Sequence, residues 1–277
     1  MKIAITVSTK DAYSEAMVVF RGIEEHLRCI AELGYDGIEL AVFDKSNFEA
    51  PRLKRLLSEY RLQVPVLSTG QIYTFQDLWF THPRREIREK AVVAFKDMIE
   101  MAAEFGADVN TSRMRGRIPQ TDSYEEGIAR LTGCLEELCR HAERYGINLL
   151  IEQMNRYETN YLLSVSEVGE YIRNTGIPNL RLHPDTFHMN IEDVDFAGAL
   201  REYRDILGYL HVADSNRLPP GKGHFDFPPL FESLKTVGYD GWIGVEVLPR
   251  PTPEEAARQS IAYLRKYVPK KGGVRKP

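Results

Sequence analysis

The chain has 277 residues, of which 43% are apolar and 27% are charged, and its formal net charge is -4. This length suits one large α/β domain as well as two small ones, and the composition is that of an ordinary globular protein. The small acidic excess argues against a general polyanion binder, and no apolar run reaches the roughly 18 residues of a membrane-spanning helix.

Apolar strand patterns and amphipathic helix patterns alternate along the whole chain. Glycines follow several predicted helices, where they act as C-terminal caps, and Pro253 lies in the first turn of the last one. The predicted strands cover residues 2–8, 35–40, 64–69, 107–111, 147–152, 179–185, 206–211 and 241–246. The predicted helices cover residues 22–33, 51–60, 84–105, 123–145, 164–175, 195–203, 227–237 and 252–267.

This alternation predicts the α/β class and a (β/α)8 TIM barrel, because every strand is followed by a helix over a short connection. We expect one barrel domain over residues 1–268, since no linker and no shift in composition divides the chain. A doubly wound sheet is less suitable, because it would not bring several separated strand ends to one place. Residues 269–277 are basic and rich in glycine and proline, which predicts a flexible tail.

Two predicted loops carry unusual side chains. Residues 70–83 form a long loop rich in aromatic residues, which predicts a lid, an oligomer contact or a simple cover for the barrel end. Residues 113–117 contain three arginines, namely Arg113, Arg115 and Arg117. These can meet an anionic substrate or remain in water, and we favour the solvated interpretation.

Four of the predicted strands end in a side chain that can bind a metal ion. These residues are Glu152, Asp185, His211 and Glu246. Because the carboxyl ends of barrel strands meet at one face, we expect the four side chains to converge. Three carboxylates and one imidazole suit Mn²⁺, Mg²⁺ or Co²⁺ better than a structural zinc ion. Each residue taken alone can instead be a polar group on the barrel rim, and Glu39 is open to both interpretations.

Further polar side chains follow the same strand ends. Glu158 follows Glu152, His188 follows Asp185, and Arg217 follows His211. Such groups are what recognition of sugar hydroxyls requires, so we assign Glu158, His188 and Arg217 to substrate binding. The alternatives are a packing role for His188, a rim charge for Arg217, and a helix cap or an ion pair with Arg156 for Glu158.

The absence of other motifs narrows the chemistry. The chain has no G-x-G-x-x-G after its first strand, no G-x-x-x-x-G-K-S/T and no G-x-S-x-G, which disfavours hydride transfer and nucleotide hydrolysis. Two glutamates beside a metal ion suggest proton transfer next to a polarised carbonyl. Glu152 or Glu246 would remove a carbon-bound proton to give an enediolate, and the other glutamate would return one.

At these positions the sequence resembles the sugar-phosphate isomerase/epimerase superfamily, and within it the ketose 3-epimerase branch (D-tagatose/D-psicose 3-epimerase-like). The matching motifs lie at residues 151–152, 155–159, 185–192, 211–217, 220–226 and 245–246. The likeness extends from Met1 to about Tyr267.

The resemblance implies a xylose isomerase-like barrel and a metal-dependent epimerisation at C3 of a ketose or keto-sugar acid. It implies that Glu152, Asp185, His211 and Glu246 bind one Mn²⁺ or Co²⁺ ion, with Mg²⁺ also suitable. Glu152 and Glu246 would be the catalytic acid–base pair, and the protein would form a homodimer or homotetramer that acts on a small sugar.

The sequence also departs from the family pattern. Pro184 precedes Asp185 where the family usually has an aliphatic residue, and residues 110–112 replace an aliphatic–glycine stretch. The second change alters the expected pocket wall. The arginine-rich and aromatic loops could admit an acidic keto-sugar in place of a neutral ketose.

Three other functions compete with the epimerase. An aldose–ketose isomerase of the hydroxypyruvate or xylose type, or an inosose dehydratase, would use the same acid–base pair. An endonuclease IV-like DNA-repair nuclease would need a multi-zinc cluster and a basic surface, which seven histidines and a net charge of -4 disfavour. A non-catalytic sugar-binding barrel would not need both glutamates.

The expected cellular location, the partners and the state of the cysteines follow from simpler features of the sequence. The first residues are predicted to form a strand and lack the pattern of a signal peptide, so we expect a cytoplasmic protein without membrane or nucleic-acid partners. The three cysteines, Cys29, Cys134 and Cys139, fall in helical patterns, where buried or incidental thiols are expected instead of a disulfide.

Overall fold

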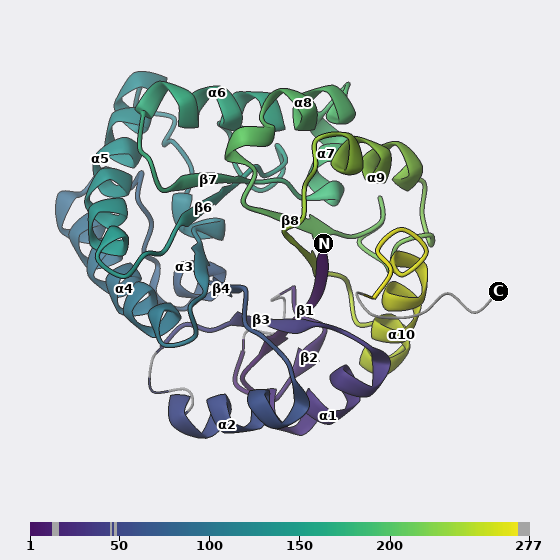
Figure 1. Ribbon diagram of the computed structural model, residues 1–277. Coiled ribbons are helices and arrows are strands. Elements are labelled where there is room, and N and C mark those ends of the chain that lie inside the picture. Colours follow the sequence, from purple (N-terminus) through teal and green to yellow (C-terminus); the bar gives the residue numbers. More distant parts are fainter. Residues whose placement is uncertain (13–16, 45, 47–48, 271–277) are drawn as a thin grey trace.

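The computed structural model describes residues 1–12, 17–44, 46 and 49–270. Strands form an inner ring and helices surround it (Figure 1). The strands are β1 (Lys2–Ser8), β2 (Phe20–Arg21), β3 (Gly37–Ala41), β4 (Val66–Ser68), β5 (Asp108–Asn110), β6 (Leu149–Glu152), β7 (Leu180–His183), β8 (Tyr209–Val212) and β9 (Trp242–Val245).

Most of the helices lie on the outside of this ring, whereas α3 lies inside the circle of outer helices, next to β4 (Figure 1). The helices are α1 (Ile23–Leu33), α2 (Ala50–Tyr60), α3 (Gly70–Gln76), α4 (Arg85–Ala103), α5 (Tyr124–Glu143), α6 (Val165–Thr175), α7 (Thr186–Glu192), α8 (Phe196–Glu202), α9 (Phe227–Thr236) and α10 (Pro253–Leu264), with the 3-10 helices η2 (Ser112–Arg115) and η3 (Arg204–Ile206).

The strands pair in parallel in the order β7-β6-β5-β4-β3-β1-β9-β8, and β2 adds to β1. Two isolated bridges, Leu182 with Leu207 and Asp185 with His211, join the two ends of this order. The ring therefore closes between β7 and β8, and the predicted (β/α)8 TIM barrel is confirmed. Its closure places Asp185 directly beside His211.

Local elements differ from the sequence prediction in several places. The predicted loop at residues 70–83 was wrong at its start, because α3 occupies its first seven residues. Part of the predicted loop at residues 113–117 belongs to η2. The short strand β2 and the helix α7 were not predicted. The predicted tail falls mostly on residues 271–277, which lie outside the described residues.

Alternation along the strands separates two layers inside the barrel. Side chains two residues apart on a strand point to the same face, so Leu150 and Glu152 on β6 both face the interior, as do Tyr209 and His211 on β8. Leu150 and Tyr209 form a small apolar cluster with Val66, against which Trp242 packs. This apolar layer supports a polar layer, which lies one step closer to the carboxyl ends of the strands.

The larger apolar core lies between the strands and the helices. It contains the outward-facing strand residues and the inner faces of the helices, such as Phe95 on α4 and Leu135 on α5. Cys134 and Cys139 are buried in α5, Cys29 is half-buried, and all three are free thiols. No helix among the described residues is long and apolar enough to cross a membrane.

Gly244 lets large side chains enter the polar layer. A Cβ atom at this position would lie 2.5 Å from the Tyr209 hydroxyl and 2.9 Å from His211 Cδ2. Real Cβ contacts are longer, so Tyr209 and His211 occupy space that only glycine leaves free.

We expect Gly244→Ala to lower the free energy of unfolding by about 1–3 kcal/mol, because the added methyl group overpacks the barrel interior. Gly133→Ala is the matched control. Gly133 is exposed within α5, and a Cβ there meets nothing within 4 Å, so we expect a gain of up to about 1 kcal/mol from helix propensity. Urea denaturation of the two variants measures both values, and equal effects would contradict this account of Gly244.

Candidate metal centre and active site

The four side chains predicted at the strand ends meet at one point. Glu152 ends β6 and His211 lies on β8. Asp185 lies two residues after the end of β7, and Glu246 directly follows β9. One ligand atom from each of the four lies within 4.8 Å of the others. The barrel thus brings together residues that are up to 94 positions apart, the difference between 246 and 152.

The donor set fits a divalent cation. The Nδ1 atom of His211 lies 3.3 Å from Glu152 Oε1 and 3.7 Å from Glu246 Oε2. Neighbouring ligands of one cation with bonds of about 2.1 Å lie about 3 Å apart in an octahedron, so a small inward movement of these atoms would suffice. Without a cation, the three carboxylates of this cluster would repel one another, because their ligand atoms lie within 4.8 Å of one another.

Glu39 holds the other side of the imidazole of His211. Its Oε2 atom lies 2.8 Å from His211 Nε2, and both side chains are completely buried. A carboxylate on one ring nitrogen fixes the ring and leaves the second nitrogen free to bind a metal. Burial favours the neutral imidazole, but Glu39 and Glu246 outweigh it and hold the pKa of His211 well above its usual value.

Glu152 is held by the neighbouring strand. The side-chain amide of Asn110, at the end of β5, donates a hydrogen bond of 3.0 Å to Glu152 Oε2. Burial alone would raise the pKa of Glu152, but the imidazoles of His183 and His211 outweigh it and hold this pKa below its usual value. Glu152 is therefore ionised at neutral pH and can accept a proton.

Arg217 ties two of the carboxylates together. Its guanidinium donates to Asp185 Oδ2 at 2.9 Å and to Glu246 Oε2, and it lies 4.6 Å over the ring of Phe187. Burial raises the pKa of Glu246 to about 8, with Glu152 and Asp185 adding to the effect. The two glutamates therefore differ in proton affinity, as a proton donor and a proton acceptor must.

His188 presents one nitrogen to the site. The backbone amide of Asn155 and its side-chain amide both donate to His188 Nδ1, at 3.3 Å and 2.7 Å. Burial lowers the pKa of His188, so its proton resides on Nε2. This atom lies 3.7 Å from Asp185 Oδ2 and can donate to a ligand in the cavity.

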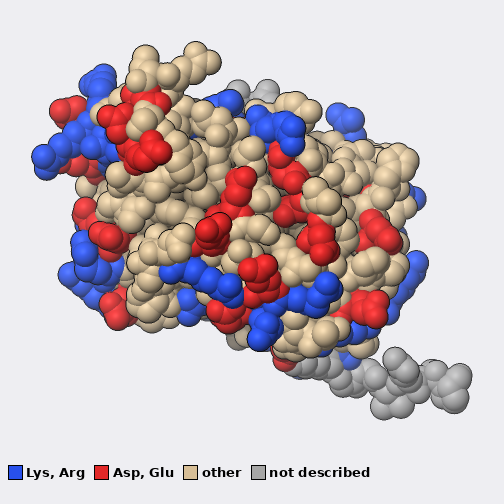
Figure 2. Space-filling view, turned by 90° about the horizontal axis from the view of Figure 1, so that it is seen from above, with Lys and Arg blue, Asp and Glu red and all other residues tan. Residues whose placement is uncertain are grey.

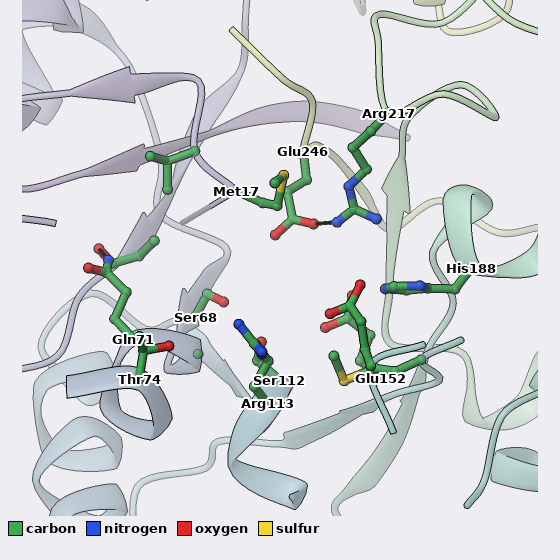
Figure 3. A pocket seen from close by; sticks show the side chains of 15 residues that line it. Met17, Ser68, Gln71, Thr74, Ser112, Arg113, Glu152, His188, Arg217 and Glu246 are labelled. Carbon is green, nitrogen blue, oxygen red and sulfur yellow. Dashed lines mark hydrogen bonds and ion pairs between the residues drawn. The ribbon is translucent and has the colours of Figure 1, made fainter. Parts of the chain in front are cut away.

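A cavity of about 270 Å³ opens beside the cluster (Figure 3). Figure 3 shows Glu152 and Glu246 near one another at one end of it, with Arg217 and His188 next to them and with Gln71 and Thr74 at the far side. Glu158 also lines the cavity. Every predicted site residue therefore lies either on the cavity wall or in the four-residue cluster beside it. Its size suits a single small sugar better than a polymer.

One alternative from the sequence is wrong, and the favoured solvation of the loop arginines holds for the exposed Arg113 and Arg117 but not for Arg115. Arg156 forms its ion pair with Glu192 at 2.8 Å, so it does not pair with Glu158. Arg115 is not solvated: it is fully buried, and its guanidinium donates to the backbone carbonyls of residues 152, 161 and 162. The burial of Arg115 could not be read from the sequence. A polar loop has no hydrophobic periodicity that would indicate burial, and backbone partners leave no complementary side chain to identify.

Sequence reasoning missed His183 and the part played by Asn110. His183 is fully buried, its ring centre lies 4.2 Å from that of His211, and it can form a second candidate ligand group with Glu152 and His211. The period of two along a strand was the available signal, because His183 lies two residues before Asp185 and faces the same way. Asn110 could be found by the same reasoning at the end of β5.

Comparisons with known proteins agree with this architecture. Residues 27–267 match the model of the xylose isomerase-like TIM barrel family. The 3-dehydro-D-guloside 4-epimerase of Escherichia coli is 30% identical over 253 residues, which cover 88% of this chain and 94% of that enzyme. The L-ribulose 3-epimerase of a Methylomonas species is 32% identical over 233 residues, or 81% of this chain and 78% of that enzyme.

A solved structure is similar over almost the whole chain. The crystal structure of 3-keto-D-glucoside 4-epimerase from E. coli, in its apo form, has a TM-score of 0.81 and 27% sequence identity, and the match covers 96% of this chain and 99% of that one.

Proposed function

The chain belongs to the xylose isomerase-like TIM barrel family, and we propose that it is an isomerase that epimerises a sugar at the carbon next to a ketone. Its two named relatives act at such a carbon: C4 beside a ketone at C3, and C3 beside a ketone at C2. For this chain we propose C3 of a ketose or keto-sugar acid.

The observation that supports this proposal best is the placement of Glu152 and Glu246. Their carboxylates lie at one end of the cavity with a gap between them (Figure 3), and the cluster they share brings an oxygen of each within 4.8 Å of the other. One carboxylate would remove the proton from one face of the sugar carbon, and the other would deliver a proton to the opposite face. Inversion of the carbon requires one carboxylate on each of its two faces.

Glu152, Asp185, His211 and Glu246 would hold one divalent cation, with Mn²⁺ or Co²⁺ the best candidates and Mg²⁺ suitable. When bound, the cation would polarise the ketone of the sugar and so acidify the neighbouring carbon. His188 would donate from Nε2 to a sugar oxygen, and Arg217 would hold Glu246 in position. Glu158 would accept a hydrogen bond from a sugar hydroxyl.

The same groups can also perform aldose–ketose isomerisation or dehydration of an inosose, and the test below separates these reactions. A nuclease has less support. Basic and acidic side chains are interspersed over the face shown in Figure 2, whereas DNA binding requires a basic surface. The expected homodimer or homotetramer and the cytoplasmic location stay predictions.

Metal affinity should rise with pH between about 6 and 8. A cation and protons compete for the same atoms, and the raised pKa values of His211 and Glu246 mean that both bind protons in this range before the cation arrives. Each proton released on binding strengthens the affinity by about tenfold per pH unit. Titration calorimetry with Mn²⁺ in buffers of different ionisation enthalpy measures both quantities, and a constant affinity without proton release would be the contrary result.

Deuterium uptake tests the reaction itself. The Mn²⁺-loaded protein is incubated in D2O with ketohexoses, ketopentoses and keto-sugar acids, and the products are analysed by NMR. We expect label at the carbon next to the ketone together with the new epimer. An aldose product labelled at C1 or C2 would instead identify an isomerase, and the absence of exchange with every sugar would remove the support for epimerisation.

Substitutions then assign the two glutamates. Glu152→Gln and Glu246→Gln should each slow epimerisation by about 10²- to 10⁴-fold. One face of the carbon can still exchange its proton in each variant, so we expect label without inversion for one epimer. Glu137→Gln, an exposed residue on α5 that pairs with Lys96, is the control and should retain the activity of the wild type.

A further inference from the structure

One arginine in the cavity has no role in the proposed reaction. Arg113 lines the same cavity as Glu152 and Glu246, and it belongs to η2. The wall around it consists of uncharged polar side chains from β4, α3 and η2, namely Ser68, Gln71, Thr74 and Ser112. Figure 3 shows Arg113 pointing into the cavity from the side away from Arg217. It is the one basic residue among those that line this wall.

The loop that carries Arg113 is fixed to the catalytic layer. Asn110, which holds Glu152, also accepts a hydrogen bond of 3.0 Å from the backbone amide of Ser112 through its side-chain oxygen. On the other side of Arg113, the buried Arg115 binds three backbone carbonyls, among them that of Glu152. Arg113 is thus held at a defined distance from Glu152, although its own side chain is exposed.

Arg113 has no acidic partner among the described residues. Its guanidinium instead lies over the ring of Tyr73 on α3, 5.2 Å from the ring centre. An aromatic ring restrains a guanidinium without neutralising it. Arg217 and Arg156, by contrast, both pair with carboxylates. Among the described residues, Arg113 therefore has no carboxylate within ion-pair distance, although Glu158 lines the same cavity, and its guanidinium remains available to an anionic group of a bound molecule.

We propose that Arg113 selects a substrate with an anionic group, so that the protein acts on a keto-sugar that carries a carboxylate or a phosphate at the end remote from its ketone. This inference rests on the proposed function, which places the ketone at the metal cluster. The remote end of the sugar then lies toward the wall of β4, α3 and η2. A guanidinium binds a carboxylate or phosphate through two parallel hydrogen bonds, and it gains little from its charge on a neutral hydroxyl.

Three probes that differ only at C6 test the proposal. D-fructose, D-fructuronate and D-fructose 6-phosphate carry a hydroxymethyl group, a carboxylate and a phosphate on otherwise equal ketohexoses. Exchange of the C3 proton in D2O gives kcat and KM for each probe. The Mn²⁺-loaded wild type is compared with Arg113→Gln and with the control Arg117→Gln, since Arg117 is also exposed and lies on the adjoining segment but does not line this cavity.

We expect the wild type to prefer one of the two anionic probes to D-fructose by at least about tenfold in kcat/KM. Arg113→Gln should lower that preference about 10- to 100-fold, mainly through KM, as expected for loss of a charge-assisted hydrogen bond. Arg117→Gln should keep it. The better anionic probe distinguishes a sugar acid from a sugar phosphate.

Two outcomes would overturn the proposal. In the first, the wild type has the same kcat/KM for D-fructose as for both anionic probes. This result would leave the proposed epimerase reaction intact and would contradict an anionic substrate. In the second, Arg113→Gln retains the preference of the wild type, or Arg117→Gln loses it equally.

Binding provides a readout that does not depend on turnover. Calorimetry measures the affinity of Glu246→Gln for the three probes, with and without Arg113→Gln. If an anionic probe binds more tightly than D-fructose and this difference requires Arg113, the anionic substrate class is supported even if no probe exchanges its C3 proton. In that case the proposed reaction is contradicted, but the role of Arg113 is not. Equal binding of all three probes contradicts the role of Arg113.

Discussion

Three carboxylates, two of them buried and one partly buried, crowd together at the carboxyl end of the barrel, and the arrangement of the site depends on how their mutual repulsion is offset. Asp185 is fully buried and Glu152 almost so, and their ligand atoms lie within 4.8 Å of those of Glu246 and His211. Burial weakens the screening that water would supply. Positive charge from neighbouring side chains offsets part of this repulsion, and we propose that a bound divalent cation offsets the rest.

The surrounding residues supply that charge in fixed positions. Arg217 bridges Asp185 and Glu246. Glu39 is itself a carboxylate, and it contributes by raising the pKa of His211 and so favouring the cationic imidazole. The result is a pair of glutamates with different proton affinities in one cavity. In the proposed reaction, one glutamate would accept a proton while the other, in its protonated form, would donate one.

Much of the fold and of the site could be predicted, because both depend on local patterns. Alternating strands and helices gave the barrel, and a polar residue at the end of an apolar strand identified Glu152 and His211. Contacts across the barrel were harder to predict. The pairing of Glu39 with His211, for example, depends on the register of strands that are far apart in the chain. Arg115 was misread as solvated because its partners are backbone carbonyls of β6 and of the loop that follows it, which leave no pattern in the sequence.

Anomalous diffraction from crystals grown with Mn²⁺ tests the central claim, that the four strand-end side chains form one metal centre. The account predicts a single manganese peak in the cavity, with ligand atoms of Glu152, Asp185, His211 and Glu246 each at about 2.0–2.4 Å. The absence of a peak between these residues, or a peak bound by His183 in place of Asp185 and Glu246, would contradict it.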